Sequence, residues 1–243
     1  MWLTELGKRI RLKREKQGLK QQDIANALRV SPQAVSKWER GENAPDIAIL
    51  SSLAQVLDAS TDWLLSGRER GEDTLEATVL FSSINGAYRR SMSMAPAEFA
   101  RWLNGIFYTL TDATLANDGV PVKYLGDGYL CFFSGPRHAD RAVKTATSAC
   151  SLISDDLRIG LNTGPIYLGA VGHPDYARPD VMGEVVNGAY LTMQWAAEYA
   201  ASGVAATSAT IATLREPVDH GEAEPVEFAG SSTPLRVSEL PVP

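Results

Sequence analysis

The stretch Lys123-Tyr124-Leu125-Gly126-Asp127-Gly128-Tyr129-Leu130 holds a Gly-Asp-Gly turn between two segments with strand character. A tight turn of this composition is the strongest short-range signal for a β-hairpin. The carboxylate of Asp127 then lies at the edge of a sheet, where it can face a metal ion or a phosphate group. Lys123 lies on the same hairpin, so the stretch predicts an acidic and a basic side chain suited to nucleotide chemistry.

The sequence on both sides of this hairpin alternates between strand and helix patterns. Strands are predicted at 77–81, in the hairpin 120–133, at 158–164, 166–171 and 204–206, near Val226 and at 235–240. Apolar residues at spacings of three and four predict helices at about 96–116, 138–153 and 184–201. This order predicts an α+β domain of the ferredoxin-like βαββαβ type, with its helices on one face of a largely antiparallel sheet.

Residues 1–66 predict a separate all-α domain of five short helices. Ser31 is a typical N-cap followed by proline, so one helix starts there, and Gly41 is a typical residue just after a helix end. The predicted helices run over about 3–17, 21–28, 31–40 and 46–57 and around Trp63-Leu64. Trp38 is expected to lie mainly in the core of this domain.

The segment Ser66-Gly67-Arg68-Glu69-Arg70-Gly71-Glu72-Asp73-Thr74 has two glycines, five charges and no aliphatic residue. This composition is typical of a solvated linker. The sequence therefore predicts domains at 1–66 and 76–243, joined by a linker at 67–75. Residues 1–70 carry 12 Lys and Arg against 9 Asp and Glu, a net +3, whereas residues 71–243 carry 11 against 20, a net −9. A basic first domain on an acidic second one favours contact between nucleic acid and the first.

The overall composition is that of a water-soluble protein, with 44% hydrophobic and 21% charged residues. No apolar run approaches the roughly 18 residues that span a bilayer, so we expect no membrane contact and a cytoplasmic location. Cys131 and Cys150 lie in apolar strand and helix patterns and are expected to be buried thiols.

Two segments of the first domain closely resemble the helix-turn-helix domain of the phage Cro and CI repressor type. They are Leu19-Lys20-Gln21-Gln22-Asp23-Ile24-Ala25 and Ser31-Pro32-Gln33-Ala34-Val35-Ser36-Lys37-Trp38-Glu39-Arg40-Gly41. The resemblance implies that the third helix enters the major groove of double-stranded DNA. It places Gln33, Ser36 and Lys37 toward the groove. It also places Gln21 and Arg40 at the phosphates, and it implies a dimer on a pseudo-palindromic operator.

The second domain resembles the catalytic domain of class III adenylate and guanylate cyclases from about Ala77 to Leu214. The resemblance rests on four segments: Val79-Leu80-Phe81-Ser82-Ser83-Ile84, Lys123-Tyr124-Leu125-Gly126-Asp127-Gly128, Arg158-Ile159-Gly160-Leu161-Asn162-Thr163-Gly164, and Val181-Met182-Gly183-Glu184-Val185-Val186-Asn187. It implies a homodimer whose two composite sites lie at the subunit interface.

The resemblance also assigns roles to individual positions. Such cyclases hold two metal ions with two aspartates, and the positions here are Asp127 and Ser83. The base-reading pair is matched by Lys123 and Asp180. Serine supplies no negative charge, although it can still hydrogen-bond a phosphate.

Two further roles fall on one helix. The ribose-orienting asparagine is matched by Asn187, whereas the arginine that stabilises the transition state is replaced by Leu191. An aliphatic side chain cannot stabilise phosphate charge, and loss of such a donor lowers a rate by about 100-fold or more.

These observations favour a homodimeric transcription regulator that is not an enzyme. Its second domain is expected to sense a nucleotide or cyclic nucleotide, with Mg²⁺ as a companion ion at Asp127 and no required cofactor. Two alternatives stay open. The second domain is only a dimerisation module, in which Lys123 and Asp180 form an ordinary salt bridge, or it is a weakly active adenylate cyclase.

Overall fold

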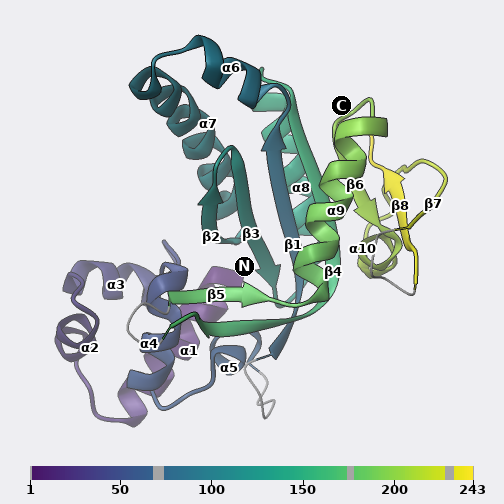
Figure 1. Cartoon of the computed structure of the whole chain (residues 1–243). Helices are drawn as coiled ribbons and strands as arrows, with labels where there is room; N and C mark the ends of the chain where they lie inside the picture. The colour runs from purple at the N-terminus through teal and green to yellow at the C-terminus, as the bar shows by residue number, and fades with distance from the viewer. Residues whose placement is uncertain (1, 68–73, 174–177, 228–232, 243) are drawn as a thin grey trace. The chain divides into compact units, whose positions relative to one another are not determined.

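The computed structural model describes residues 2–67, 74–173, 178–227 and 233–242. The chain forms two compact units (Figure 1). The first consists of Met1–Glu76, Ser134–Pro136 and Pro165–Gly183. The second consists of Ala77–Phe133, Arg137–Gly164 and Glu184–Pro243.

The helical part of the first unit confirms the five predicted helices. They are α1 (Trp2–Lys16), α2 (Gln21–Leu28), α3 (Pro32–Arg40), α4 (Ile47–Val56) and α5 (Thr61–Ser66). The Ser31 side chain accepts a hydrogen bond from the backbone N–H of Ala34 and so caps α3, and Gly41 ends it with a φ of 68°. These local signals explain why α3 has the predicted bounds.

The core of these helices is built from apolar residues of all five. Ile10, Ile24 and Val35 are fully buried, and Trp38 is buried with 4% of its surface exposed, as predicted. A Cβ atom on Gly7 would lie 2.4 Å from the carbonyl oxygen of Trp38. The absence of a side chain at Gly7 therefore lets α1 approach the backbone of α3.

Strand β4 (Leu157–Val171) corrects one prediction. The segments 158–164 and 166–171, predicted as two strands, are one continuous strand, and β5 (Arg178–Met182) is the strand that pairs antiparallel with its end. Pro165 lies between the residues of β4 that pair with β6 and those that pair with β5. A proline is tolerated in a strand where its missing N–H is not needed.

The remaining elements belong to the α+β part of the chain. They are β1 (Thr74–Ile84), α6 (Ala87–Ser93), α7 (Pro96–Ala116), β2 (Val120–Leu125), β3 (Gly128–Ser134), α8 (His138–Leu152), α9 (Glu184–Tyr199), β6 (Val204–Thr207), α10 (Ser208–Thr213), β7 (Glu224–Val226) and β8 (Leu235–Glu239). The sheet has the order β2-β3-β1-β4-β6-β8-β7. Its first four strands have the neighbours of a ferredoxin-like βαββαβ unit, so the predicted fold class is confirmed.

The hairpin β2–β3 is confirmed as predicted. Leu125 pairs with Gly128, which leaves Gly126 and Asp127 as the two residues of the turn. Gly126 has a φ of 63°, a conformation that glycine adopts without steric penalty. The turn thus fixes Asp127 at the end of two paired strands.

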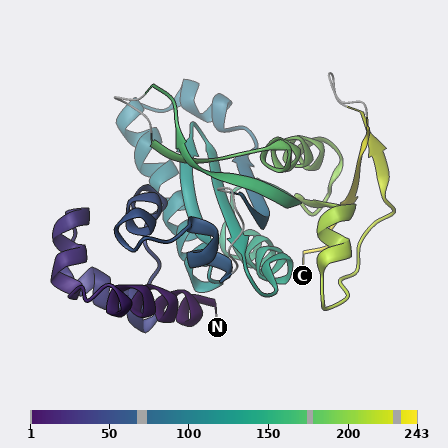
Figure 2. The ribbon, with the colours of Figure 1, turned by 90° about the horizontal axis from the view of Figure 1, so that it is seen from below.

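The sequence predicts all helices on one face of the sheet, which is wrong for α9. Ile159 and Leu161 of β4 belong to the apolar core that α7 and α8 cover. Gly160, between them, faces α9, because a Cβ atom there would lie 2.3 Å from the carbonyl oxygen of Ala189. Figures 1 and 2 show α8 and α9 on opposite sides of β4. Because Gly160 has no side chain, α9 can pack closely against this second face of the sheet.

The sequence does not predict the two short helices α6 and α10, because neither has a stripe of apolar residues. Of α6 only Ala87 is buried, and Tyr88 and Met92 are exposed. Within the described residues, no helix is both long and apolar enough to cross a membrane.

Both cysteines are free thiols, and Cys131 is fully buried. Burial raises the pKa of Cys131 to about 12 and that of Cys150 to about 11. Neither thiol is therefore ionised near neutral pH.

Candidate functional site

Helix α3 presents the polar side chains that the sequence predicts for the DNA groove. Gln33 and Lys37 are exposed and Ser36 is half-buried, while Val35 and Trp38 face the core. Residues at these positions share the outer side of a short helix. The side chains of Gln33 and Lys37 are therefore accessible to a bound partner.

Arg40 and Gln21, predicted as phosphate contacts, have partners within the protein. The Arg40 guanidinium donates to Ser36 Oγ at 2.5 Å and to the exposed carboxylate of Glu42. The Gln21 amide donates to Glu39 Oε2 at 2.7 Å. A phosphate contact by Arg40 would have to compete with Glu42, and one by Gln21 would have to compete with Glu39.

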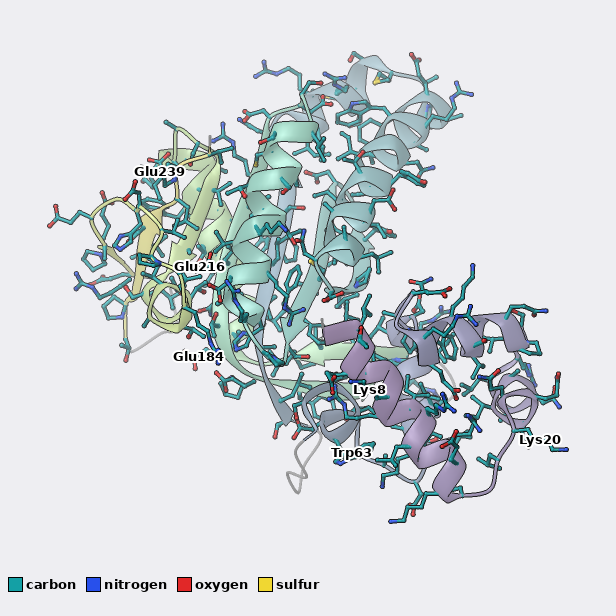
Figure 3. The ribbon with its side chains drawn as sticks, turned by 180° about the vertical axis from the view of Figure 1, so that it is seen from behind. Lys8, Lys20, Trp63, Glu184, Glu216 and Glu239 are labelled. Carbon is teal, nitrogen blue, oxygen red and sulfur yellow. The ribbon has the colours of Figure 1, made fainter. Side chains whose placement is uncertain are left out.

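The basic residues of α1 divide into surface and structural ones. Lys8, labelled in Figure 3, is exposed and pairs with Glu5. Arg14 donates two hydrogen bonds to the buried carboxylate of Glu39, at 2.5 and 3.0 Å. Arg9 donates to the carbonyl oxygens of Leu64 and Leu65 and so caps the end of α5. Arg9 and Arg14 therefore hold the helices together, whereas Lys8 lies on the surface.

The second unit brings Asp127 and Ser83 together. Oδ2 of Asp127 accepts a hydrogen bond of 2.6 Å from Ser83 Oγ and one of 3.1 Å from the backbone N–H of Ile84. The end of β1 and the β2–β3 turn are thereby joined through a single carboxylate. Ser83 acts as a donor here, a role that an aspartate at this position could not fill when ionised.

These residues do not fit a pair of metal ions. A two-metal site uses several carboxylate oxygens, whereas Ser83 supplies a hydroxyl to this junction and Oδ2 of Asp127 already accepts two hydrogen bonds. Among the residues that the structure describes, no group of three or more His, Cys, Asp or Glu could hold a metal ion.

A pocket of about 720 Å³ opens beside Asp127, between the sheet and α9. Its lining includes Phe81, Ser83, Asp127, Tyr190, Gln194 and Glu198. The rings of Phe81 and Tyr190 meet edge to face, with centroids 5.2 Å apart. Gln194 Nε2 donates to the Tyr190 hydroxyl at 3.1 Å. The pocket therefore combines two aromatic rings with hydrogen-bonding groups, a lining typical of small-molecule sites.

The sequence reading missed Phe81, Tyr190 and Gln194. Tyr190 and Gln194 are four residues apart on α9 and so share a face of that helix. A search for polar residues at helical spacing after Asn187 would have found them.

Helix α9 carries Asn187 and Leu191. It begins at Glu184, which Figure 3 labels, and Asn187 is exposed while Leu191 is half-buried. Both residues lie on one face because they are four residues apart. A ligand at this face meets an amide and an aliphatic side chain.

The two predicted base-reading residues belong to different units. Lys123 is half-buried on β2, opposite Leu130. Asp180 lies on β5 opposite Gly169, and its Oδ1 accepts a hydrogen bond from the backbone N–H of Val181. Asp180 is thus in the first unit, whereas Lys123, Asp127 and Asn187 are in the second.

Comparison with protein families gives two matches. Residues 70–234 match the family model described as the adenylate and guanylate cyclase catalytic domain. Residues 10–64 match the helix-turn-helix family model. The helix-turn-helix match lies within the helical segment from α1 to α5, and the cyclase match covers the elements from β1 to β7.

Relatives of both kinds are known. An adenylate cyclase of Mycobacterium tuberculosis is 34% identical over 152 residues, which cover 56% of this chain and 34% of that protein. The chain thus spans about a third of the length of the curated cyclases it matches. The HTH-type transcriptional regulator DicA of Escherichia coli is 39% identical over 69 residues, covering 28% of this chain and 51% of DicA.

The fold also has solved counterparts. The adenylyl cyclase CyaB from P. aeruginosa superimposes with a TM-score of 0.62 at 20% identity, over 69% of this chain and 94% of that one. At this identity the likeness concerns the fold.

Proposed function

The chain belongs to the family of adenylate and guanylate cyclase catalytic domains, and we propose that this domain serves here as the nucleotide sensor of a transcription regulator. In this proposal the helix-turn-helix domain binds an operator. The cyclase-type domain dimerises the chain and binds a nucleotide or cyclic nucleotide without converting it. A regulator of this kind acts in the cytoplasm, where the DNA is.

The observation that carries the proposal is the hydrogen bond from Ser83 to Asp127. In the cyclase family two aspartates hold the metal ions, and here the first position is a hydroxyl that donates to the second. Asp127 therefore lacks a second carboxylate with which to share metal ions. Without that charge, the ribose hydroxyl is not activated and the triphosphate is not neutralised.

Leu191 supports the same conclusion. The family places an arginine four residues after the ribose-orienting asparagine, and this chain has Leu191 four residues after Asn187. A missing cationic donor lowers the rate by about 100-fold or more. By contrast Lys123, Asp180 and Asn187, which would contact base and ribose, keep the family's residue types.

The DNA-binding half of the proposal rests on α3 and on the two-fold symmetry expected of a homodimer. Two copies of α3 would read half-sites one helical turn, or a multiple of it, apart. A ligand shifts the spacing of the two heads only if it binds one arrangement better than the other. The proposal therefore requires that nucleotide and operator influence each other's affinity.

Isothermal titration of the full chain tests the sensing claim. ATP, GTP, cyclic AMP, cyclic GMP and cyclic dinucleotides are titrated with and without Mg²⁺, and operator affinity is measured with each. We expect at least one to bind and to change operator affinity, and Lys123→Ala to weaken that binding. If none of these nucleotides binds and operator affinity stays unchanged, the domain is a dimerisation module and not a sensor.

A second candidate function is weak adenylate cyclase activity. It is favoured by the adenylate cyclases among the relatives and by the retention of Asp127. It predicts cyclic AMP formed from ATP with Mg²⁺ or Mn²⁺, in an amount that Asp127→Ala abolishes. Mass spectrometry after long incubation at high protein concentration separates this candidate from binding without turnover.

A further inference from the structure

Helix α9 rests on strand β4 through two positions that lack side chains. A Cβ atom on Gly160 of β4 would lie 2.2 Å from the backbone nitrogen of Met193. A Cβ atom on Gly188 of α9 would lie 2.2 Å from Asn162 Nδ2. At one end of the contact, helix backbone therefore lies on strand backbone. At the other end it lies on the side chain of Asn162.

Both polar atoms of the Asn162 amide form hydrogen bonds inside the protein. Its Nδ2 donates to the carbonyl oxygen of Val185, in the first turn of α9, at 3.1 Å. Its Oδ1 accepts from Thr207 Oγ1 at 2.7 Å and from the backbone N–H of Thr163 at 3.0 Å. Only 6% of the residue is exposed. The side chain therefore has one orientation that satisfies all its partners.

A chain of buried hydroxyl groups continues from Thr207 away from α9. Thr207 Oγ1 lies 3.3 Å from Thr210 Oγ1, which accepts from Thr163 Oγ1 at 3.0 Å. Thr163 in turn lies 2.7 Å from Thr78 Oγ1, and Thr78 lies 2.8 Å from Nδ1 of His138. Hydrogen bonds in such a chain polarise and strengthen one another. Through Thr207, this chain connects the side chain of Asn162 to β1, α8 and α10 as well as to β4.

We propose that Asn162 is a positioning residue that fixes the first turn of α9 and so sets the place of Asn187. The inference rests on the proposed function, in which Asn187 contacts the ligand. Asn187 lies between the two residues that Asn162 touches, the carbonyl of Val185 and the backbone of Gly188. Movement of this turn along or about the helix axis would therefore move Asn187 with it.

Amide hydrogen exchange of the full chain, with no ligand present, tests the positioning directly. We expect Asn162→Ala to speed exchange of amides 186–192 by about tenfold, the effect of losing one net hydrogen bond of about 1.4 kcal/mol. Amides 195–199, further along the same helix, should keep their rates. Unchanged exchange at 186–192 would overturn the inference.

Thr207 provides a conservative pair of variants. Thr207→Val removes the hydroxyl that orients Asn162, and Thr207→Ser keeps it. We expect Thr207→Val to speed amide exchange at 186–192. Thr207→Ser should leave these rates as they are in the natural chain. Thr145→Val is the matched control, because the buried Thr145 hydroxyl donates to the Arg141 carbonyl of its own helix. An equal effect from the control would mean that general destabilisation, and not positioning, is being measured.

A double-mutant cycle separates this inference from the proposed function. With ATP and cyclic AMP as probes, Asn162→Ala should weaken binding about tenfold in the natural sequence and have no further effect beside Asn187→Ala. Equal losses in both backgrounds would overturn positioning through Asn187 while leaving nucleotide binding established. If neither probe binds the natural chain, the proposed function loses its support, and the exchange rates alone decide whether Asn162 holds the turn.

Discussion

The hydroxyl of Ser83 donates a 2.6 Å hydrogen bond to Oδ2 of Asp127 and joins the end of β1 to the β2–β3 turn. Hydrogen bonds to an ionised carboxylate are among the stronger ones in proteins. The contact thus replaces a pair of repelling carboxylates, which only bound cations would stabilise, by an attractive pair. The junction is stable without cations, at the expense of the charge that would attract them.

Introducing a carboxylate at Ser83 and a guanidinium at Leu191 should create cyclase activity. We expect Ser83→Asp together with Leu191→Arg to form cyclic AMP from ATP and Mg²⁺ at least about 100-fold faster than the natural chain. Product is measured by mass spectrometry. Adding Asp127→Ala to the double variant should abolish it. A double variant that binds ATP but yields no product would contradict the residue assignment.

The effect of Gly188→Ala on the free energy of unfolding should change sign with the residue at position 162. In the natural chain the new methyl group meets Asn162 Nδ2 at 2.2 Å, so we expect a loss of about 1–3 kcal/mol in the free energy of unfolding. In the Asn162→Ala background the space is free, and the same change should stabilise by about 1 kcal/mol, the difference in helix propensity. Chemical denaturation of all four proteins measures both steps. Two losses of equal size would contradict the contact.

His138 should make stability depend on pH. Burial, assisted by the positive charge of Arg141, lowers the pKa of His138 to about 4. In the unfolded chain the pKa is about 6.5. Between these values the unfolded chain binds the proton and the folded chain does not, so the free energy of unfolding falls as the pH drops from about 6.5 to about 4. Because the ring is partly exposed, we expect a loss of about 1–2 kcal/mol.

The control for this effect is His138→Gln, which does not titrate. Denaturant midpoints at pH 7.5 and pH 5 are compared for both proteins. His173 and His220 are present in both and cancel in the comparison. An equal pH response of the variant would show that His138 is not responsible.

Glu39 should be important for the stability of the helix-turn-helix domain. Glu39→Ala removes the two short hydrogen bonds that the nearly buried guanidinium of Arg14 donates to this carboxylate, and it removes the acceptor of Gln21. We expect a loss of about 3 kcal/mol, measured by calorimetry of the full chain. Glu15→Ala removes an exposed carboxylate that pairs with Arg11 and makes only a long, 3.5 Å contact with Arg14, so it should leave the transition nearly unchanged. Similar shifts for both variants would argue against a special role of Glu39.

Gln33 and Lys37 should affect DNA binding in different ways. Gln33→Ala should reduce discrimination at one base pair by about 1–3 kcal/mol, because glutamine reads base edges. Lys37→Ala should weaken binding to all sequences and lower the salt slope by about 1. Operators selected from random oligonucleotides provide the assay. Lys8→Ala, an equal charge change on α1, should have little effect, and a matching loss would contradict the assignment of α3.

The sequence was sufficient for elements whose local signals are strong. The cap at Ser31, the glycine at 41 and the Gly-Asp turn at 126–127 each determine the backbone locally, and the structure has the predicted bounds there. The family resemblance of two separate motifs places Ser83 and Asp127 at one site. The hydrogen bond between them cannot be predicted from local sequence, because 44 residues separate them in the chain.

Other features depend on the packing around a residue and not on its local sequence. Gly160 reads as an ordinary strand residue, yet its missing side chain decides on which face α9 lies. Pro165 reads as a strand end, but it lies between two pairing regions of one strand. Asn162 belongs to a recognisable motif, and its proposed role as a link between β4 and α9 depends on hydrogen-bond partners from β4, β6 and α9. Such features are set by tertiary packing, which local periodicity does not record.

The alternation of side chains along β4 also bears on how such a protein can diverge. Ile159 and Leu161 can exchange for other large apolar residues, with compensating changes in α7 and α8, without altering the surface on which α9 lies. Gly160 allows no such exchange, because any side chain there meets the backbone of α9, and Gly188 allows one only when Asn162 changes as well. Related sequences should therefore drift freely on one face of this strand and stay constant on the other.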